Sequence, residues 1–151
     1  MIKLLQIKNL DQLVPLFDQY MVFYGKESNP SRYEAYLRER IGQNEATVFI
    51  AYGDENRAIG FVLNYHSFSS VSLGKIIVLN DLYVIEAERK NGIGQSLIEK
   101  TFELAKETGA VRVDLGTAKT NTAAQGLYEK LGFVKDTEFY AYSYSLKTKA
   151  E

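Results

Sequence analysis

The stretch from Lys75 to Gly109 constrains the fold of this chain more than any other part of the sequence. Between Lys75 and Ile85, apolar residues occupy both alternating faces, which is typical of a strand that is buried on both sides. From Ile93 the apolar residues recur at helical spacing, and Gly109 follows as a helix stop. A buried strand followed by a long amphipathic helix predicts a sheet covered by helices, which is the α/β class.

The remaining elements extend this pattern over the whole chain. We predict strands at residues 2–7, 47–52, 58–63, 75–85, 111–115 and 138–146, and helices at 10–24, 32–41, 93–108 and 121–131. The second and third strands form an antiparallel hairpin, because a turn rich in Gly, Asp and Asn joins them. Residues 67–74 are expected to form a loop. Since the sequence has no repeat, linker or low-complexity segment, residues 1–151 are expected to form one α/β domain with a mixed sheet.

Composition excludes several functions. The chain contains no cysteine and one histidine, His66, so thiolate sites, disulfides and multi-histidine metal sites are excluded and no metal is expected. With 18 basic and 19 acidic residues the net charge is −1, which argues against nucleic acid as a partner. No apolar run is long enough for a membrane span, and the first residues lack the pattern of a signal peptide. A cytoplasmic protein without membrane contact is the expectation.

Two polar residues interrupt the most hydrophobic strand. Asn80 and Asp81 lie within the 75–85 stretch, where burying polar groups costs free energy unless they have partners. The pair fits either a bulge or strand end, where the side chains reach water or the backbone, or a functional site. The sequence leaves both readings open.

A glycine-containing segment lies between this strand and the next helix. It reads Arg89-Lys90-Asn91-Gly92-Ile93-Gly94-Gln95-Ser96. Glycines let backbone N–H groups approach a ligand, the first turn of a helix adds unpaired donors, and two cations add positive charge. A flexible turn explains two glycines beside two cations less well than a phosphate site does. The segment therefore predicts a site for a pyrophosphate.

Two nucleotide-binding motifs are absent or incomplete in this segment, which narrows the possible phosphate ligands. No Walker sequence occurs, and the dinucleotide fingerprint would require a third glycine where Leu97 stands. Asp114 does lie 20 residues beyond Gly94, where an acid could bind a ribose. However, seven residues separate Val84 from Gly92, whereas that fingerprint opens directly after its strand. A nicotinamide-dependent oxidoreductase remains a weaker alternative.

The helix predicted at 121–131 has a partly thin surface. Ala123, Ala124 and Gly126 are small, so a ligand or another element can approach closely. Tyr128 shares a face with Ala124 at i,i+4 spacing. Taken alone, such a tyrosine is more often a packed core aromatic than a catalytic group.

Together these segments resemble the GNAT family of N-acetyltransferases. The stretch from Leu82 through Arg89-x-x-Gly92-Ile93-Gly94 is similar to the family's acetyl-CoA motif, (Q/R)xxGx(G/A) after a hydrophobic strand. The stretch Asn121-x-x-Ala124-x-x-Leu127-Tyr128-x-x-Leu131-Gly132-Phe133 resembles its second motif. The resemblance implies a single-domain GNAT-like fold, with a mixed, mostly antiparallel twisted sheet flanked by about four helices.

The resemblance also implies roles for particular residues. The backbone of Leu82, Tyr83 and Val84 would pair with the pantetheine arm of acetyl-CoA, and Asn121 and Ala124 would border that arm. Tyr128 would act as the general acid toward the departing thiolate. The pyrophosphate would be held by Arg89 and by the backbone N–H groups of Lys90, Asn91, Gly92, Ile93, Gly94 and Gln95.

The general base is less clearly marked. In the diamine-acetylating branch of the family a glutamate often stands where this chain has Asn80, which cannot accept a proton. Asp81 ranks first as the base, although it faces the opposite side of the strand unless a bulge redirects it. Glu86 or a chain of water molecules is the alternative.

The function implied is acetyl-CoA-dependent N-acetylation of a primary amine, by direct attack of the amine. The acceptor would be a polyamine-like small molecule or an amino-acid or peptide amine. The family's first two helices commonly roof the acceptor site, where the aromatic residues 20–24 would lie. A non-catalytic acyl-CoA sensor on the same fold stays open because of Asn80. The alternating segment 138–146 fits either a homodimer contact or a cover for its own sheet.

Overall fold

The computed structural model describes residues 1–146 of the chain. These residues belong to two compact units, of which the first comprises Met1–Gly116 and the second begins at Thr117. The first unit contains the whole sheet and three of the helices.

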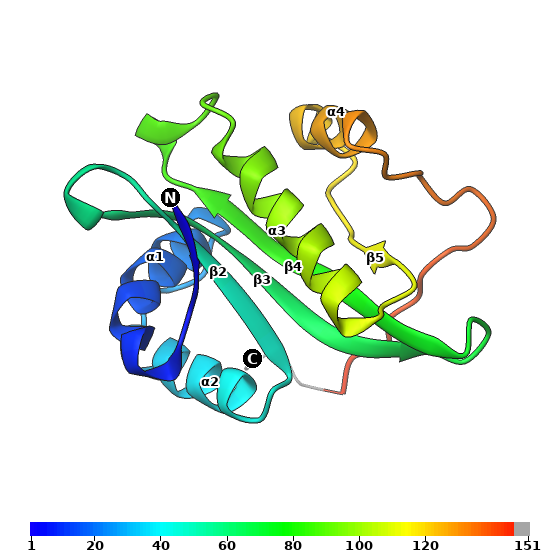
Figure 1. Cartoon of the computed structure of the whole chain (residues 1–151), viewed down its shortest axis with the longest axis horizontal. Coiled ribbons are helices and arrows are strands. Elements are labelled where there is room, and N and C mark those ends of the chain that lie inside the picture. Colours follow the sequence, from blue (N-terminus) through cyan, green and yellow to red (C-terminus); the bar gives the residue numbers. More distant parts are fainter. Residues whose placement is uncertain (147–151) are drawn as a thin grey trace. The chain divides into compact units, whose positions relative to one another are not determined.

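A five-stranded mixed sheet forms the centre of the first unit (Figure 1). Its strands, in spatial as in chain order, are β1 (Ile2–Leu4), β2 (Ala46–Tyr52), β3 (Ala58–Ser69), β4 (Gly74–Val84) and β5 (Val113–Asp114). Neighbours from β1 to β4 are antiparallel, whereas β5 lies parallel to β4. The expected mixed, mostly antiparallel sheet is therefore confirmed.

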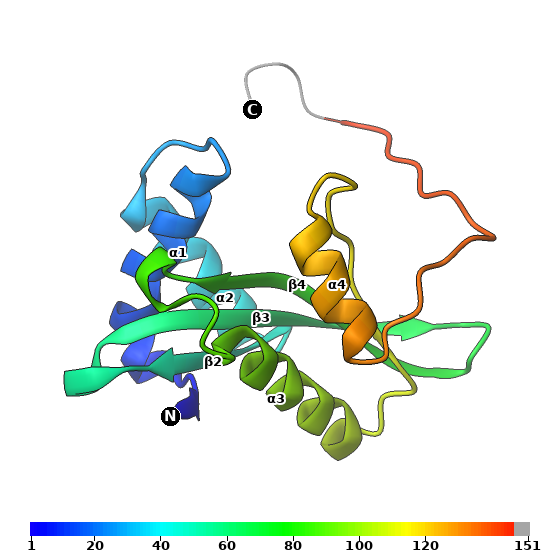
Figure 2. The ribbon, with the colours of Figure 1, turned by 90° about the horizontal axis from the view of Figure 1, so that it is seen from above.

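Helices cover both faces of this sheet. Figure 2 shows α1 (Leu10–Phe23) and α2 (Pro30–Gly42) on one face and α3 (Ile93–Thr108) on the other. A fourth helix, α4 (Thr122–Lys130), belongs to the second unit. Short 3₁₀ turns occur at Ile7–Asn9, Asp54–Asn56 and Glu86–Glu88. The fold class is thus α/β, and residues 1–146 contain four α-helices, as the periodicity predicts.

The apolar spacing of each helix explains the face that it buries. On α1, Leu13 and Phe17 lie one helical turn apart and are buried against Ile50 of β2 and Phe61 of β3. On the other face, α3 buries five residues at helical spacing, namely Leu97, Ile98, Thr101, Leu104 and Ala105. The sheet between them is consequently covered on both sides, which is what the apolar strand at 75–85 requires.

Local signals place the ends of two helices. The side-chain oxygen of Asn29 accepts a hydrogen bond from the backbone N–H of Arg32, and Pro30 occupies the first turn of α2. Gly109 adopts φ +75° after α3, a conformation that glycine reaches without steric cost. The predicted helices at 32–41 and 93–108 are confirmed, the first with slightly wider bounds.

Some strand boundaries differ from the prediction. The β3 strand continues to Ser69 and β4 begins at Gly74, so half of the predicted loop at 67–74 is paired strand and residues 70–73 form the turn. The predicted strand at 111–115 is shorter, as Val113–Asp114. The first strand ends at Leu4 instead of residue 7, because the chain enters a 3₁₀ turn at Ile7. Alternation alone does not reveal where a strand loses its partner.

The strand predicted at 138–146 is wrong. Within the second unit's described residues the structure contains α4 and no strand. Tyr140, Tyr142 and Tyr144 are all exposed, so their alternation does not correspond to a buried face. A strand requires a hydrogen-bonded neighbour as well as alternation. Residues 138–146 do not belong to a strand in the structure.

No helix in residues 1–146 combines the length and the apolar character needed to cross a membrane.

Candidate active site

A β-bulge in β4 lies at the polar pair Asn80-Asp81. Asp81 is paired with Leu63 of β3, but Leu79 is paired with the next residue, Asn64. Asn80 is therefore the extra residue on β4, with no counterpart on β3. Leu79 and Asp81 would face the same side of a regular strand, and the bulge turns Asp81 to the side of Leu63. That side belongs to α1 and α2.

The Asp81 carboxylate is buried and hydrogen bonded. Asp81 is 9% exposed. The phenol of Tyr20 donates to Oδ1 at 2.5 Å, and the amide Nδ2 of Asn80 donates to Oδ2 at 3.0 Å. Burial raises the pKa of Asp81 above its ordinary value, whereas the two hydrogen bonds act to lower it. The predicted bulge is present, but the Asp81 carboxylate bonds to two side chains, and it lies with a raised pKa on the sheet face that α1 and α2 cover.

Aromatic rings pack around Tyr20, the hydrogen-bond donor to this carboxylate. Tyr20 makes edge-to-face contacts with Phe61 and Tyr83, with ring centroids 5.5 and 5.8 Å apart. Tyr65, on β3, is close enough for the Asp81 charge to act on it, and its phenol is 2.5 Å from that of Tyr36 on α2. Burial, that hydrogen bond and the Asp81 charge all raise the pKa of Tyr65.

On the sheet face that α3 covers, a buried polar residue next to the bulge is hydrogen bonded to its neighbours. Asn64, fully buried on β3, accepts a hydrogen bond from the hydroxyl of Thr101 on α3 at 3.0 Å. Its amide donates to the backbone carbonyl of Thr47 on β2 at 3.3 Å. The register shift lies between Leu63 and Asn64. Leu63 pairs with Asp81, whereas Asn64 pairs with Leu79. The partners of Asn64 on β2 and α3 therefore fix the sheet where the bulge occurs.

Beyond the bulge, β4 has an open edge within the first unit. Among the residues that the structure describes, β5 pairs only with Ile77 and Val78 of β4. The N–H of Ile85 bonds to the carbonyl of Ile59, so by alternation the backbone groups of Leu82 and Val84 point away from β3. These are groups to which an extended ligand can add as a strand.

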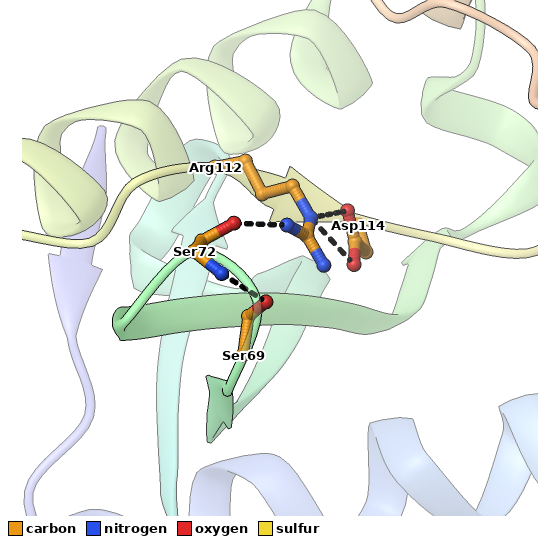
Figure 3. Close-up of polar contacts among 4 residues, drawn as sticks. All are labelled: Ser69, Ser72, Arg112 and Asp114. Carbon is orange, nitrogen blue, oxygen red and sulfur yellow. Dashed lines mark hydrogen bonds and ion pairs between the residues drawn. The ribbon is translucent and has the colours of Figure 1, made fainter.

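The β5 end of this edge is fixed by a polar cluster (Figure 3). Nε of Arg112 donates to both carboxylate oxygens of Asp114, at 2.9 and 3.1 Å, and Nη1 donates to Ser72 Oγ at 3.2 Å. The N–H of Ser72 in turn donates to Ser69 Oγ. Asp114, the candidate ribose-binding acid of the nicotinamide alternative, is thus paired with Arg112, which directly precedes β5.

The glycine-containing segment forms a turn into α3. Lys90 and Gly92 both have positive φ, at +67° and +78°, and nothing lies within 4 Å of where a Cβ on Gly92 would stand. Ser96 donates the first helical hydrogen bond, to the carbonyl of Gly92 at 3.0 Å. The N–H groups of Ile93, Gly94 and Gln95 precede that bond, so the helix offers them no internal partner. This is the local geometry that an anion requires.

The Arg89 side chain lies against the strand end. Its Nε donates to the backbone carbonyl of Val84 at 2.8 Å. Its guanidinium lies over the rings of Phe23 and Tyr83, 5.4 and 5.6 Å from their centroids. Arg89 therefore connects the open edge of β4 to α1, an arrangement that the sequence motif does not indicate.

The remaining predicted residues lie in the second unit. Asn121 is the N-cap of α4, and its side-chain oxygen accepts from the N–H of Ala124 at 3.1 Å. Tyr128 lies on the same helix, half-buried, with its ring edge-to-face to Phe133 at 5.7 Å. The predicted helix at 121–131 is confirmed with bounds one residue shorter at each end.

Sequence reasoning missed two contacts of this site. The Tyr20–Asp81 hydrogen bond joins residues 61 positions apart, and Asn64–Thr101 joins residues 37 apart. The segment 20–24 is rich in aromatic residues and indicates a functional surface on the first helix. No pattern of neighbouring residues, however, shows which distant residue this surface contacts. The only other signal is a polar residue, Asn64, that directly follows the apolar run of β3.

Comparisons with known proteins show the family of this chain. Residues 12–133 match the model of the acetyltransferase (GNAT) family. The uncharacterized N-acetyltransferase YhfO of Bacillus subtilis (strain 168) is 38% identical over 138 residues, covering 91% of each chain. The thialysine N-epsilon-acetyltransferase of Caenorhabditis elegans is 28% identical, over 85% of this chain and 79% of that protein. A crystal structure of a probable acetyltransferase superimposes with a TM-score of 0.92 at 37% identity, covering 99% of both chains.

The fold and these relatives define an enzyme of the N-acetyltransferase class. The chain belongs to the GNAT acetyltransferase family. The family resemblance of the two sequence motifs is confirmed by the match, which spans both of them. Within residues 1–146 no three side chains of His, Asp or Glu are grouped so that they could hold a metal ion.

Proposed function

We propose that this protein transfers an acetyl group from acetyl-CoA to a primary amine, with the whole chain, residues 1–151, working as one domain. The observation that carries the proposal is the bulge at Asn80. It turns a buried carboxylate to one face of the sheet, directly before the stretch of β4 that lacks a β5 partner. A base and a binding edge thus lie side by side on one strand.

The residues present fit the donor. Leu82 and Val84 offer backbone groups to a pantetheine amide, and the turn at Lys90–Gln95 offers N–H groups and one exposed lysine to a pyrophosphate. Acetyl-CoA would supply the acetyl group as a thioester. We assign Arg89 to the same site as a cation beside the Val84 carbonyl. Asn121 and Ala124 would border the pantetheine arm.

The chemistry assigned to the side chains is acid–base catalysis. Asp81 accepts the proton that the amine loses as the new C–N bond forms and the C–S bond breaks. Tyr128 donates a proton to the departing sulfur, as the second family motif implies. A carboxylate with a raised pKa is a better proton acceptor than an ordinary aspartate, provided that it is ionised at the working pH.

The acceptor proposed is a small polyamine-like amine or an amino-acid or peptide amine. A relative carries the name thialysine N-epsilon-acetyltransferase, and this supports an amine at the end of a side chain as the class to test first. The aromatic rings beside Asp81 suit an ammonium group, because cations are attracted to ring faces. We expect neither nucleic acid nor a membrane as partner. A homodimer and a cytoplasmic location also stay predictions.

The donor class is tested by thermal unfolding with acetyl-CoA, CoA and NAD(P)H. A ligand that binds only the folded state at 100 times its Kd adds about 2.7 kcal/mol of stability. We expect acetyl-CoA and CoA to raise the unfolding temperature and NAD(P)H to leave it unchanged. A shift with NAD(P)H alone would overturn the acetyltransferase assignment for this site.

A non-catalytic acyl-CoA sensor would give the same thermal shifts. The two functions separate in a thiol-release assay, which a chain without cysteine permits without background from the protein. A sensor binds acetyl-CoA and releases no CoA with any amine. An enzyme releases CoA in proportion to acetylated amine.

A further inference from the structure

The Asp81 carboxylate is held from outside its own sheet by one residue of α1. Tyr20 donates its phenol proton to Oδ1 at 2.5 Å, across 61 positions of sequence. The bond joins the helical layer to the bulge, and its length is at the short end for O–H···O, as expected when the acceptor is charged. Tyr20 is thus the direct structural link between α1 and the proposed base.

The packing of the Tyr20 ring fixes the position of its hydroxyl. The ring contacts Phe17 of its own helix at 5.8 Å, Phe61 of β3 at 5.5 Å and Tyr83 of β4 at 5.8 Å between centroids. Contacts from three elements leave the phenol little freedom to turn away from Asp81. A group held in this way keeps its partner oriented without reorganisation.

The hydrogen bonds on the carboxylate are divided between its two oxygens. Oδ1 accepts from Tyr20, and Oδ2 accepts from the amide of Asn80, the bulge residue. The second donor is on an exposed residue of the same strand, whereas the first comes from the packed helix. Tyr20 therefore determines the orientation of the carboxylate more firmly than Asn80 does.

We propose that Tyr20 is a positioning residue of the transferase, which holds the Asp81 carboxylate turned toward the acceptor and in its ionised form. The proposal rests on the proposed function, in which Asp81 accepts the proton of the amine. Tyr20 keeps its own proton throughout, so the proton balance of the reaction is unchanged. Its proposed effect on the reaction is exerted through Asp81.

The groups that face Asp81 make this role testable by pH. Burial raises the pKa of Asp81, and the bonds from Tyr20 and Asn80 oppose that rise. Tyr65 faces it from β3 and stays neutral over the range in which a carboxylate titrates, because burial and Tyr36 raise its pKa. Arg40 of α2 acts on Tyr65 and is paired with Glu39 and Glu45. Removing the Tyr20 hydroxyl therefore removes one of the two opposing bonds and raises the pKa of Asp81 further.

The experiment compares Tyr20→Phe with a matched control on the same aromatic cluster. Tyr33→Phe also removes one phenol, which donates to the backbone carbonyl of Glu27, and its ring likewise packs on Phe17. Both changes keep the ring, so the fold is preserved. Two quantities are measured in each protein: the pKa of Asp81, from the ¹³C shift of its carboxyl carbon, and kcat/KM against pH with one amine.

We expect Tyr20→Phe to raise the Asp81 pKa and to move the acid limb of kcat/KM to higher pH by the same amount. On that limb activity falls by about tenfold, which corresponds to the loss of one hydrogen bond to a charged group. Tyr33→Phe should leave both quantities unchanged. The acceptor's own titration cancels in the comparison, because the same amine is used.

Two results overturn the proposal in distinguishable ways. An unchanged Asp81 pKa in folded Tyr20→Phe would show that the phenol does not control this carboxylate. A raised pKa with an unmoved acid limb would show that Asp81 is not the base, and the proposed catalytic role of Asp81 would fail together with the positioning role.

Discussion

At the scale of single residues, Asp81 is the group whose environment has the clearest consequence. The strand carries it into an apolar layer, where the charged form is disfavoured and the pKa is raised. In the unfolded chain the same group titrates near its ordinary value. An ionised Asp81 therefore costs stability at neutral pH, and this cost vanishes as the pH falls below the ordinary value.

We predict that Asp81→Asn is more stable than the natural protein at pH 7, by on the order of 1 kcal/mol. The amide keeps the shape of the side chain and an acceptor for Tyr20 while removing the buried charge. The difference in urea midpoint between the two proteins should shrink steadily as the pH falls well below the ordinary aspartate pKa of about 3.9, where Asp81 becomes protonated in both folded and unfolded states. A difference that is independent of pH would show that the charge is not the cause.

For Tyr128 the expected effect is on turnover alone. Tyr128→Phe keeps the ring and its contact with Phe133 but removes the proton that we assign to the departing sulfur. We expect kcat to fall by about 10²-fold, in the range of a lost general acid, with the Kd for acetyl-CoA within about twofold. Isothermal titration and steady-state kinetics measure the two quantities. Unchanged kcat would remove Tyr128 from the mechanism.

At the scale of elements, the turn into α3 and the bulge in β4 are the two features that shape the site. Both depend on backbone geometry more than on side-chain chemistry. The turn needs a left-handed residue at Gly92, and the bulge needs one residue more on β4 than on β3. Changes in the backbone therefore test them best.

Gly92→Val has a matched control at the other end of the same helix. Gly92 and Gly109 have φ of +78° and +75°, and in each case nothing lies within 4 Å of the position that a Cβ would take. Valine at either place costs about 1–2 kcal/mol of backbone strain. We expect similar losses of stability, but only Gly92→Val should weaken acetyl-CoA binding strongly, by at least about tenfold. Equal affinities in the two variants would contradict the pyrophosphate assignment.

Deletion of Asn80 should be tolerated by the fold. Because the bulge supplies one extra residue, its removal leaves Leu79 and Asp81 on their present faces and restores a regular ladder with β3. Deletion of Leu82, by contrast, would move Tyr83 and Val84 to the wrong faces of the sheet. We expect cooperative unfolding to persist in the first variant and to be lost in the second, as measured by circular dichroism.

The helices of this structure could be predicted from local sequence, whereas the bulge and the strand partners depend on contacts between distant residues. The helices at α2, α3 and α4 were predictable because periodicity, Pro30, Gly109 and Asn121 are signals carried by neighbouring residues. The bulge was only one of two readings, since its existence depends on the register with β3. The strand expected at 138–146 is wrong for the same reason, because alternation says nothing about a partner.

At the scale of the whole molecule, each layer of the first unit contributes a different part of the candidate site. The sheet presents the open edge and the carboxylate, α3 begins at the turn that we propose for the anion, and α1 supplies Tyr20, which packs on aromatic residues of β3 and β4. The polar pair Asn64–Thr101 holds the sheet on α3 at the point where the bulge occurs. The acyl transfer that we propose at this bulge would use all of these parts, and the chain belongs to a family of acetyltransferases.

The proposed acetylation of a primary amine is tested most directly by thiol release from acetyl-CoA. The purified protein is incubated with acetyl-CoA and a panel of polyamines, amino acids and peptides, with matched alcohols as controls. We predict CoA release with at least one primary amine and none with the alcohols. If the protein binds acetyl-CoA yet no amine in the panel releases CoA above the uncatalysed rate, the enzymatic function is contradicted and a sensor takes its place.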